Sequence, residues 1–377
     1  MTASAPRLPV LHLLDFLRPG VGVPETLNLL IEPCRAAGFE LHAAPLHREP
    51  GDLGAELSAR GVPLLDLDVG FPRRARRLVR LLRHVRRHSI RVVHANEYRA
   101  IRLALLLSRL APSLRVLGHL RVTGNVRSGS GRRERWLARH ARRLTELVAV
   151  SQAVLDDFRA ATGLDGFGRV IWNGRPLARF ASGARERAAA RRELALPDGV
   201  PALVCAATLQ PSKDPGTLLR AAAEMARAGI GFVLLLAGEG PARRELEELA
   251  AAPPLAGRVR LLGRRDDVPR LFAAADLYVS SSSREGLPGA VIEAQASGLP
   301  CVVTRCGGPE EVVVDGETGL VVAPGDPAAL ARAIASLLGD APRRARMAEA
   351  ARANARRFDL GAMVDAWTAL YRAALAR

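Results

Sequence analysis

Short apolar segments alternate with amphipathic stretches from one end of the 377-residue chain to the other, and this alternation constrains the fold more than any other feature. Apolar strands separated by helical stretches are typical of parallel sheets that helices cover on both faces. The pattern therefore predicts an α/β fold. In the first half, the predicted strands are Val10–Leu14, Leu41–Ala44, Val62–Leu65, Val92–His94, Val116–His119, Leu147–Val150 and Val170–Trp172.

Amphipathic periodicity predicts helices between these strands, for example over Thr26–Ala37, Arg73–Arg87 and Ala100–Leu110. The pattern breaks at Arg175–Leu196, which is rich in Arg and Ala, and we interpret this segment as a link followed by an entry helix. From Arg343 onward the chain predicts two helices and no strand. Between these points the pattern restarts, with predicted strands Ala202–Ala207, Phe232–Ala237, Val259–Leu262, Leu277–Ser280, Cys301–Thr304 and Leu320–Val322.

The repetition predicts two doubly wound, Rossmann-like domains. We expect an N-terminal domain over residues 1–175, a second domain over residues 176–355 and a C-terminal helix over residues 356–377. Open parallel sheets bind ligands at the carboxyl ends of their strands, where helix N-termini attract phosphate. The two domains are therefore expected to face a cleft that holds the functional site.

Composition excludes several other classes of protein. With 49% hydrophobic residues the chain can bury two cores, so disorder is not expected. No apolar run reaches the roughly 18 to 20 residues that a membrane-spanning helix needs. The four cysteines have neither the density of a disulfide scaffold nor the paired spacing of a zinc site, and we interpret them as reduced cytosolic thiols.

The net charge of +17 has two explanations, which the sequence leaves open. An anionic partner would be nucleic acid, an acidic membrane face or a phosphorylated substrate. Alternatively, the charge is compositional: of the 55 basic residues only Lys213 is a lysine and the other 54 are arginines, as coding from GC-rich DNA would produce.

The most informative stretch begins at Asp276, directly before the predicted strand Leu277–Ser280, which ends in a run of serines. Glu285 lies in the Glu-Gly turn that follows. Pro288 stands where a helix can begin, because proline lacks the backbone donor that the first helical turn would leave unpaired anyway. Glu293 then falls about a turn and a half inside that helix. One carboxylate can face the sugar end of a ligand and the other its ribose, while the amides from Gly286 to Gly289 hold a diphosphate. The alternative is an ordinary helix start, enriched in Glu and Pro.

The only lysine provides a second candidate. Lys213 lies in the loop Ala207–Asp214, directly after the first predicted strand of the second half. A loop lysine is usually a solvated side chain. Here every other basic position is Arg, and a compact ammonium at the carboxyl edge of a sheet is a good partner for phosphate oxygens.

The first half offers weaker candidates. Gly20 and Gly22 follow the first predicted strand and open a helix, although glycines mark any tight turn. His119 ends a predicted strand, where its ring can enter the cleft or serve as a buried structural residue. His94 also ends a strand and is the lesser candidate.

Together these residues resemble glycosyltransferase family 4, the retaining enzymes with the GT-B fold. The resemblance covers nearly the whole second half and continues more weakly into the first. It is carried by the Lys213 loop, Leu236–Pro241, Leu262–Val268, the pair Glu285 and Glu293, Gly307–Glu311, Asp315–Leu320, Val148–Val154 and Ile171–Gly174.

The resemblance implies a role for each candidate. Glu285 would lie against the donor sugar and Glu293 would hold the ribose hydroxyls. Lys213 would neutralise the diphosphate, supported by the amides of Gly286, Leu287 and Pro288. The family fold would also send the C-terminal helix back to the first domain. Glu285, Lys213 and His119 form the expected catalytic set; Glu293, Gly286, Leu287, Pro288, Thr208, Arg264 and Gly22 form the expected donor-binding set.

Two departures from the family pattern stand out. The family commonly has an Arg five positions before the lysine, where this chain has Thr208, so one phosphate cation is missing. The usual Gly-Gly of the first loop is Gly20-Val-Gly22 here, which makes that correspondence approximate.

A mechanism follows for a nucleotide diphosphate-sugar donor, with a UDP- or GDP-sugar expected. Breaking the anomeric bond develops positive charge on the sugar and negative charge on the diphosphate, so stabilisation must face both. Lys213 and the helix start suit the leaving group, and Glu285 suits the sugar. With these groups on the phosphates, and no Asp-x-Asp at a strand end, we expect no metal ion and no cofactor. Retention is expected, with the leaving phosphate taking the acceptor proton.

The acceptor stays open, with a lipid-linked or cell-envelope glycan among the candidates. We expect it to dock on the first domain near the basic loop Arg127–Arg133. The basic amphipathic helix Arg73–His88 either lies on anionic lipid or is a solvated face. The expected location is cytoplasmic, with peripheral contact at the inner membrane face as the open extension.

Two other functions stay open. A sugar-nucleotide 2-epimerase shares the fold, although the spacing of Glu285 and Glu293 argues against it. A nucleic-acid-binding protein would explain the charge. The 15 aromatic residues do not interleave with basic ones, so stacking platforms for single strands are lacking, and we expect no nucleic-acid partner.

Overall fold

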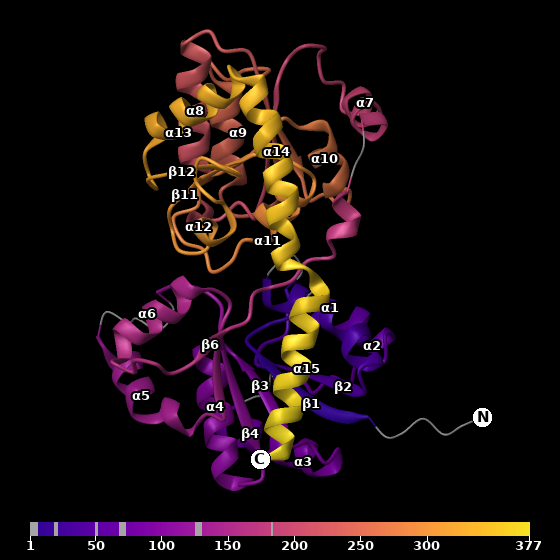
Figure 1. The fold of residues 1–377 in the computed structure, drawn as a ribbon. Helices are drawn as coiled ribbons and strands as arrows, with labels where there is room; N and C mark the ends of the chain where they lie inside the picture. The colour runs from indigo at the N-terminus through magenta and orange to yellow at the C-terminus, as the bar shows by residue number, and fades with distance from the viewer. Residues whose placement is uncertain (1–6, 19–21, 50–51, 68–72, 125–129, 182–183) are drawn as a thin grey trace, which may run out of the picture. The chain divides into compact units, whose positions relative to one another are not determined.

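The computed structural model describes residues 7–18, 22–49, 52–67, 73–124, 130–181 and 184–377. The chain divides into two compact units. The first contains residues 1–174 and 360–377, and the second contains residues 175–359, so the C-terminal helix belongs to the first unit (Figure 1). Among the described residues, no helix combines the length and the apolar character needed to cross a bilayer.

The first unit is built on a parallel sheet with the order β2-β1-β3-β4-β5-β6. Its strands are apolar along most of their length because helices pack on the sheet, which is why the sequence pattern reveals them. The strands are β1 Leu8–Leu14, β2 Phe39–Pro45, β3 Val92–Asn96, β4 Arg115–Leu120, β5 Glu146–Ala149 and β6 Arg169–Val170.

Helices connect these strands, and the C-terminal helix α15 (Leu360–Ala376) packs with them. Trp367 and Tyr371 of α15 are among the largest fully buried side chains, and they share one core with Val10, Leu27 and Phe39. The other helices are α1 Gly22–Ala36, α2 Gly54–Ala59, α3 Arg73–Arg87, α4 Glu97–Leu110, α5 Arg132–His140, η1 Ala141–Arg143 and α6 Gln152–Thr162.

The second unit contains a parallel sheet with the order β12-β11-β10-β7-β8-β9. This is the strand order of a doubly wound nucleotide-binding fold, in which the direction of winding reverses between the first and fourth strands, here β7 and β10. The strands are β7 Ala202–Ala206, β8 Val233–Ala237, β9 Val259–Gly263, β10 Leu277–Ser280, β11 Cys301–Thr304 and β12 Gly319–Val322.

Helices of the second unit begin where the sequence supplies caps. Asp214, Asp326 and Asp340 each accept a hydrogen bond from the backbone amide three residues later, which satisfies one unpaired donor of the first turn. The elements are η2 Leu177–Phe180, α7 Ala184–Glu193, η3 Pro211–Lys213, α8 Pro215–Arg227, α9 Arg243–Ala251, α10 Val268–Ala274, α11 Gly289–Ala296, α12 Pro309–Val312, α13 Pro327–Leu338, α14 Ala341–Ala355 and η4 Arg356–Phe358.

The predicted α/β class and the two doubly wound sheets are confirmed, and one predicted strand is wrong. Residues 62–65 form a single bridge, between Leu64 and Ala43, instead of a strand. Pro63 lacks a backbone donor, so only its carbonyl joins the ladder, where it accepts from the amide of Ala43 at 3.0 Å. Leu65 completes the contact by donating to the carbonyl of Ala43 at 2.8 Å.

Candidate functional site

The winding of the second sheet reverses between β7 and β10, and the two candidate loops of this unit follow these strands. Lys213 belongs to the loop after β7, and Glu285 to the loop after β10. Because β7 and β10 are neighbouring parallel strands, both loops leave the same edge of the sheet. A crevice at such a reversal is where open α/β sheets bind ligands.

Side-chain and backbone hydrogen bonds join the two loops. Ser281 Oγ donates to the carbonyl of Asp214 at 2.7 Å, and the amide of Ser283 donates to the carbonyl of Ser212 at 2.9 Å. The serine run after β10 therefore serves to fasten the lysine loop in place. This gives the run a structural role that the sequence alone does not reveal.

The structure brings Lys213 and Glu285 into direct contact. Lys213 Nζ donates to Glu285 Oε1, and Ser282 Oγ donates to the same oxygen at 2.9 Å. The side chains are 22% and 11% exposed, so this charged pair is largely shielded from water. A pair of opposite charges at this depth is strengthened by the low local dielectric and is held in one geometry.

The predicted diphosphate cradle lies directly after Glu285. The described helix α11 begins at Gly289, with Pro288 as the residue that precedes it, so the helix starts one residue later than predicted. Glu293 consequently lies about one turn inside the helix. The first backbone amides of α11 have no partner within the helix, which makes the helix start suited to binding an anion.

A glycine of the next loop, Gly308, lies against the backbone of the predicted diphosphate cradle. A Cβ atom at Gly308 would approach the carbonyl oxygen of Gly286 to 2.0 Å, so only glycine allows the two backbones to lie this close. The same relationship occurs after β7, where a Cβ at Gly238 would approach the carbonyl oxygen of Ala207 to 1.9 Å. These glycines therefore set the shape of the loops around the candidate site.

Glu293 forms an ion pair that the sequence did not reveal. Arg175 Nε lies 3.2 Å from Glu293 Oε1, and the two side chains are 7% and 21% exposed. The guanidinium also lies against the start of α11, because a Cβ at Gly289 would approach Arg175 Nη2 to 1.9 Å. Arg175 thus places a second cation beside the proposed diphosphate cradle.

The remaining donor-binding candidates of this unit lie in different surroundings. Thr208 is partly buried in the loop that carries Lys213. Arg264 follows β9, which forms the edge of the sheet, and its side chain is 62% exposed beside Asp266. The structure therefore brings Lys213 and Glu285 together and leaves Arg264 outside that cluster.

Thiol groups around the cluster are held neutral. Burial raises the pKa of Cys306 to about 12, and the carboxylate of Glu285 adds to the effect. Burial likewise raises the pKa of Cys205 to about 12. These protonated thiols are poor nucleophiles and poor metal ligands, so Lys213 and Glu285 remain the candidate catalytic groups of this loop pair.

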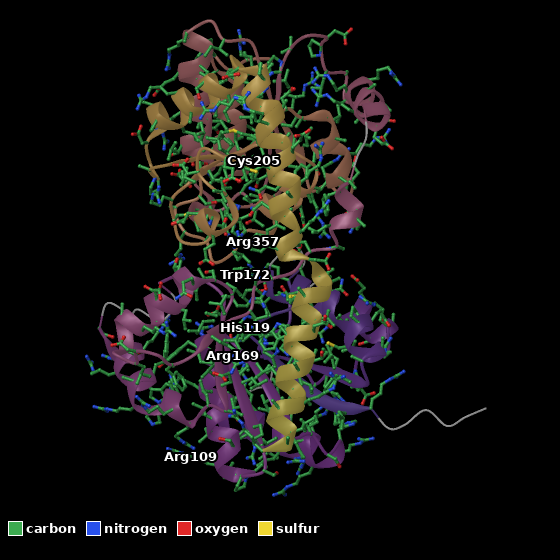
Figure 2. The ribbon with its side chains drawn as sticks, viewed as in Figure 1. Arg109, His119, Arg169, Trp172, Cys205 and Arg357 are labelled. Carbon is green, nitrogen blue, oxygen red and sulfur yellow. The ribbon has the colours of Figure 1, made fainter. Side chains whose placement is uncertain are left out.

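His119 lies in the interior of the first unit (Figure 2). Its Nδ1 is 2.9 Å from His94 Nε2, and His94 Nδ1 is 2.8 Å from the hydroxyl of Tyr371. Burial lowers the pKa of His119 well below its usual range, with a further contribution from Arg121. If His119 is catalytic, as predicted, its ring acts in the neutral form.

Gly22 is the first residue of α1, while its predicted partner Gly20 lies outside the described residues. The carbonyl of Gly22 accepts hydrogen bonds from Thr26 Oγ1 at 2.7 Å and from Arg121 Nη2 at 3.1 Å. The basic loop predicted for the acceptor also falls partly outside, because residues 125–129 are not described.

Sequence reasoning missed three charged residues of the first unit. Asp15 and Glu97 follow β1 and β3, the strands between which the winding of this sheet reverses. Glu97 has a φ of 70° and accepts a hydrogen bond from the amide of Arg121 at 2.9 Å. Burial raises its pKa to about 7, against the lowering effect of Arg121. Strained backbone and a carboxyl group that titrates near neutrality mark this edge as a second candidate site.

Most residues of both units match models of known protein families. Residues 22–179 match the family model described as Glycosyltransferase Family 4, and residues 186–354 match the model described as Glycosyl transferases group 1. The chain is 37% identical over 175 residues to the lipopolysaccharide core biosynthesis glycosyltransferase LpsE of Rhizobium meliloti, covering 46% of this chain and 50% of that protein. It is 39% identical over 204 residues to D-inositol 3-phosphate glycosyltransferase of Salinispora tropica, covering 50% and 42%. The chain thus spans about half the length of the curated relatives it matches.

Solved structures share the fold over nearly the whole chain. HepE of Anabaena in complex with UDP superposes with a TM-score of 0.84 at 22% identity, covering 97% of this chain and 100% of that chain. WaaG, a glycosyltransferase involved in lipopolysaccharide biosynthesis, superposes with a TM-score of 0.74 at 18% identity, covering 96% and 99%. At these identities the likeness concerns the fold.

Proposed function

Since the chain belongs to glycosyltransferase family 4 and has the GT-B fold, we propose that it transfers a sugar from a nucleotide diphosphate-sugar to an acceptor, with retention of configuration. The observation that supports this most directly is the contact between Lys213 and Glu285 where the winding of the second sheet reverses. That position joins a cation, a carboxylate and a helix start at one sheet edge.

Each of these groups has a task in the proposed reaction. As the anomeric bond breaks, negative charge develops on the departing diphosphate and positive charge on the sugar. The Lys213 ammonium, Arg175 and the first amides of α11 suit the diphosphate, while Glu285 suits the sugar. Glu293 would hold the ribose hydroxyls. The leaving phosphate would accept the acceptor proton, so the proposed reaction needs neither a metal ion nor a cofactor.

For the donor we propose a UDP- or GDP-sugar. A UDP-sugar has support in the solved relatives, because HepE structures hold UDP and UDP-glucose. For the acceptor we propose a cell-envelope or lipid-linked glycan bound at the first unit, where Asp15, Glu97 and Arg121 could hold hydroxyl or phosphate groups. Relatives named for lipopolysaccharide core and for inositol 3-phosphate support acceptors of these kinds.

The proposed cytoplasmic enzyme would contact the inner membrane face through α3. Arg76, Arg80, Arg83 and Arg87 are exposed and recur at helical spacing, which creates one basic stripe. Val79 is 46% exposed beside them. Basic side chains near an anionic leaflet contribute about 1 kcal/mol each, so this stripe would give salt-sensitive, reversible binding.

A panel of UDP-, GDP-, ADP- and dTDP-sugars in a thermal-unfolding assay tests the donor. A ligand present at about 100 times its dissociation constant stabilises a protein by about 2.7 kcal/mol, so a true donor raises Tm clearly. Lys213→Ala should reduce the rise by about half or more. NMR of the product made with the best donor then reports the anomeric configuration. An inverted product, or epimerised donor formed without any acceptor, would contradict the proposal.

A further inference from the structure

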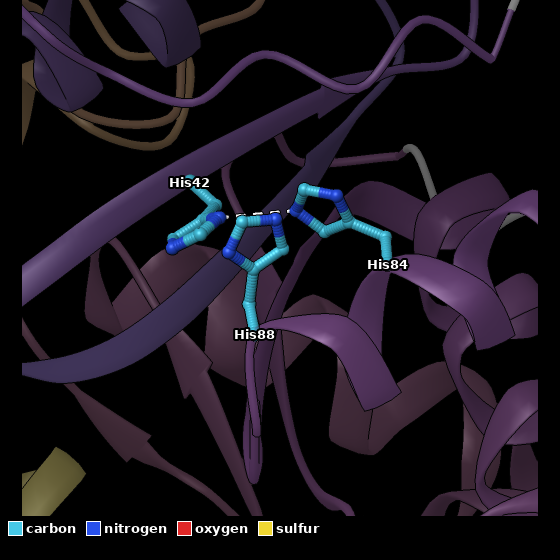
Figure 3. A group of neighbouring side chains, drawn as sticks. All are labelled: His42, His84 and His88. Carbon is cyan, nitrogen blue, oxygen red and sulfur yellow. Dashed lines mark hydrogen bonds between the residues drawn. The ribbon is translucent and has the colours of Figure 1, made fainter.

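Three histidines of the first unit converge on one point (Figure 3). His42 comes from β2, His84 from the last turn of α3, and His88 follows that helix directly. One ring nitrogen of each lies within 4.8 Å of the corresponding nitrogens of the other two. The closest approach is 3.0 Å, between His42 Nδ1 and His84 Nε2.

The fold holds these side chains in place before any ligand arrives. The His42 side chain is completely buried, so its ring has little freedom to turn. The backbone amide of His88 donates to the carbonyl of His84 at 3.0 Å, so the helical turn continues one residue beyond α3 and the two side chains lie on the same side. Arg77 fixes the helix by donating hydrogen bonds to the carbonyls of Leu67 at 2.8 Å and Leu46 at 2.5 Å.

A carboxylate sets the orientation of the buried ring. Glu40 Oε2 lies 3.1 Å from His42 Nε2. An ionised carboxylate only accepts hydrogen bonds, so His42 Nε2 carries the proton and His42 Nδ1 presents its lone pair to the other two rings. A histidine whose second nitrogen donates to a carboxylate is the usual arrangement around a bound metal ion, where it fixes the tautomer and raises the basicity of the ligand.

We propose that His42, His84 and His88 form a binding site for a divalent transition-metal ion of the zinc type, with Glu40 as the positioning residue. Imidazole nitrogens suit zinc, copper and nickel ions, and three of them leave one coordination position for water. With zinc–nitrogen distances of about 2.0 to 2.1 Å, a tetrahedral ion needs its ligand nitrogens about 3.3 Å apart. The ring nitrogens all lie within 4.8 Å of one another, with one pair at 3.0 Å, so small ring rotations suffice to reach this spacing.

The positive charge of nearby arginines opposes the binding of a cation, but only weakly. Arg83, Arg86 and Arg87 lie on the same helix and are exposed. Exposed charges are screened by salt, whereas coordination bonds act over direct contact. Glu40 supplies a compensating negative charge beside His42. The site is independent of the proposed transfer reaction, since none of its residues belongs to the donor-binding or catalytic set.

The proposed ion would join β2 to the end of α3. The helix α3 is already anchored by the buried side chains of Leu81 and Val85 and by hydrogen bonds such as Arg80 Nη1 to the carbonyl of Asp66. A metal link at its C-terminal end would add to these contacts and stabilise that end against local opening. Binding should therefore be visible in thermal unfolding as well as in direct titration.

Isothermal titration of the full chain, prepared without a histidine tag, with Zn²⁺ tests the site. We expect one ion per chain, and at least tenfold weaker binding in both His84→Ala and His88→Ala. Glu40→Gln should weaken binding about 10- to 100-fold, as loss of a carboxylate partner does at zinc sites. His140→Ala is the matched control: this histidine ends α5, is also partly buried and stacks on Trp136 at 4.5 Å between ring centres.

The outcomes separate cleanly. Zinc should raise Tm of the parent and of His140→Ala, EDTA should reverse the rise, and the cluster variants should show none. Should zinc bind the parent and both cluster variants equally, or bind none of them, the proposal is wrong. Since His88 lies beyond the helix end, His88→Ala keeps the test decisive even if His84→Ala unfolds. Nucleotide-sugar binding should be the same with and without zinc, so failure here leaves the proposed transfer reaction unaffected.

Discussion

Lys213 Nζ contacts the same carboxylate oxygen of Glu285 that accepts a hydrogen bond from Ser282 Oγ. One oxygen therefore receives two donors, and the lysine is positioned by the group it neutralises. A diphosphate that binds here would compete with Glu285 for the ammonium. In the proposed reaction, the pair would therefore couple donor binding to the orientation of the catalytic carboxylate.

This coupling predicts different effects of removing each partner. Hydrogen bonds to charged groups contribute about 1.5 to 3 kcal/mol, so Lys213→Ala should weaken binding of a nucleoside diphosphate roughly 10- to 150-fold. Glu285→Gln should leave that affinity within a few fold and lower kcat. Titration calorimetry and steady-state kinetics measure these effects. Arg220→Ala is the control, since this side chain is 57% exposed beside Asp214. Unchanged nucleotide affinity in folded Lys213→Ala would remove the proposed role of the lysine.

We predict that replacing Thr208 with arginine strengthens nucleoside diphosphate binding. The family commonly has an Arg at this position, and Thr208 belongs to the same loop as Lys213. Thr208→Arg should therefore add a phosphate contact and tighten nucleoside diphosphate binding by up to roughly 1.5 to 3 kcal/mol. Thr208→Gln, which lengthens the side chain without charge, should not. Equal affinities of the two variants in calorimetry would show that the missing cation is not limiting.

A further prediction concerns Arg175 and Glu293, whose ion pair is 3.2 Å long. Removing one partner of a fully buried pair costs about 3 to 5 kcal/mol, and the partial exposure of Glu293 reduces this to roughly 2 kcal/mol. Arg175→Met should lower the free energy of unfolding by that amount in chemical denaturation. Arg175→Lys, which keeps the charge, should lose less.

The same pair separates structure from ligand recognition. If Glu293 holds ribose hydroxyls, Glu293→Gln should weaken binding of UDP or GDP about tenfold and leave pyrophosphate binding unchanged. Competition titrations with the two ligands measure the difference. An equal loss for both ligands would assign Glu293 to the stability of the helix start instead.

The strands of the second unit were predictable because each is an apolar run bounded by turn residues. Cys301–Thr304 and Leu277–Ser280 match the structure residue for residue. Val62–Leu65 failed because an apolar run with a proline at its second position looks the same whether it pairs along its length or at one residue. Apolar character therefore locates a segment in the core, while backbone donors decide whether it forms a strand.

The candidate site was predictable only in part. Lys213 and Glu285 stood out by residue type and by their places after strands, but their contact depends on strand order, which the sequence does not display. Arg175 was missed because its partner is 118 positions away, as the numbering of the ion pair shows. His42 lies 42 positions from His84, and such convergence appears only once β2 and α3 are packed.

The first unit predicts a specific dependence of stability on pH. The hydroxyl of Tyr371 lies 3.2 Å from His12 Nε2 and 2.8 Å from His94 Nδ1, and His94 in turn contacts His119. Burial, followed by Arg121, lowers the pKa of His12 to about 3, and burial lowers those of His94 and His119 well below 6.5. The folded protein therefore keeps these rings neutral.

Below pH 6.5 these histidines become protonated in the unfolded chain but stay neutral in the folded chain. The free energy of unfolding should therefore fall as the pH falls. Each group contributes a slope of about 1.4 kcal/mol per pH unit well below 6.5, which for His12 ends near pH 3. His12→Phe should reduce the slope between pH 6 and pH 4 by one such increment. Phe39→Leu, which alters the same core without removing a titrating group, should shift stability equally at every pH. Urea unfolding at several pH values measures both, and an unchanged slope in His12→Phe would mean that this ring is protonated in the folded protein.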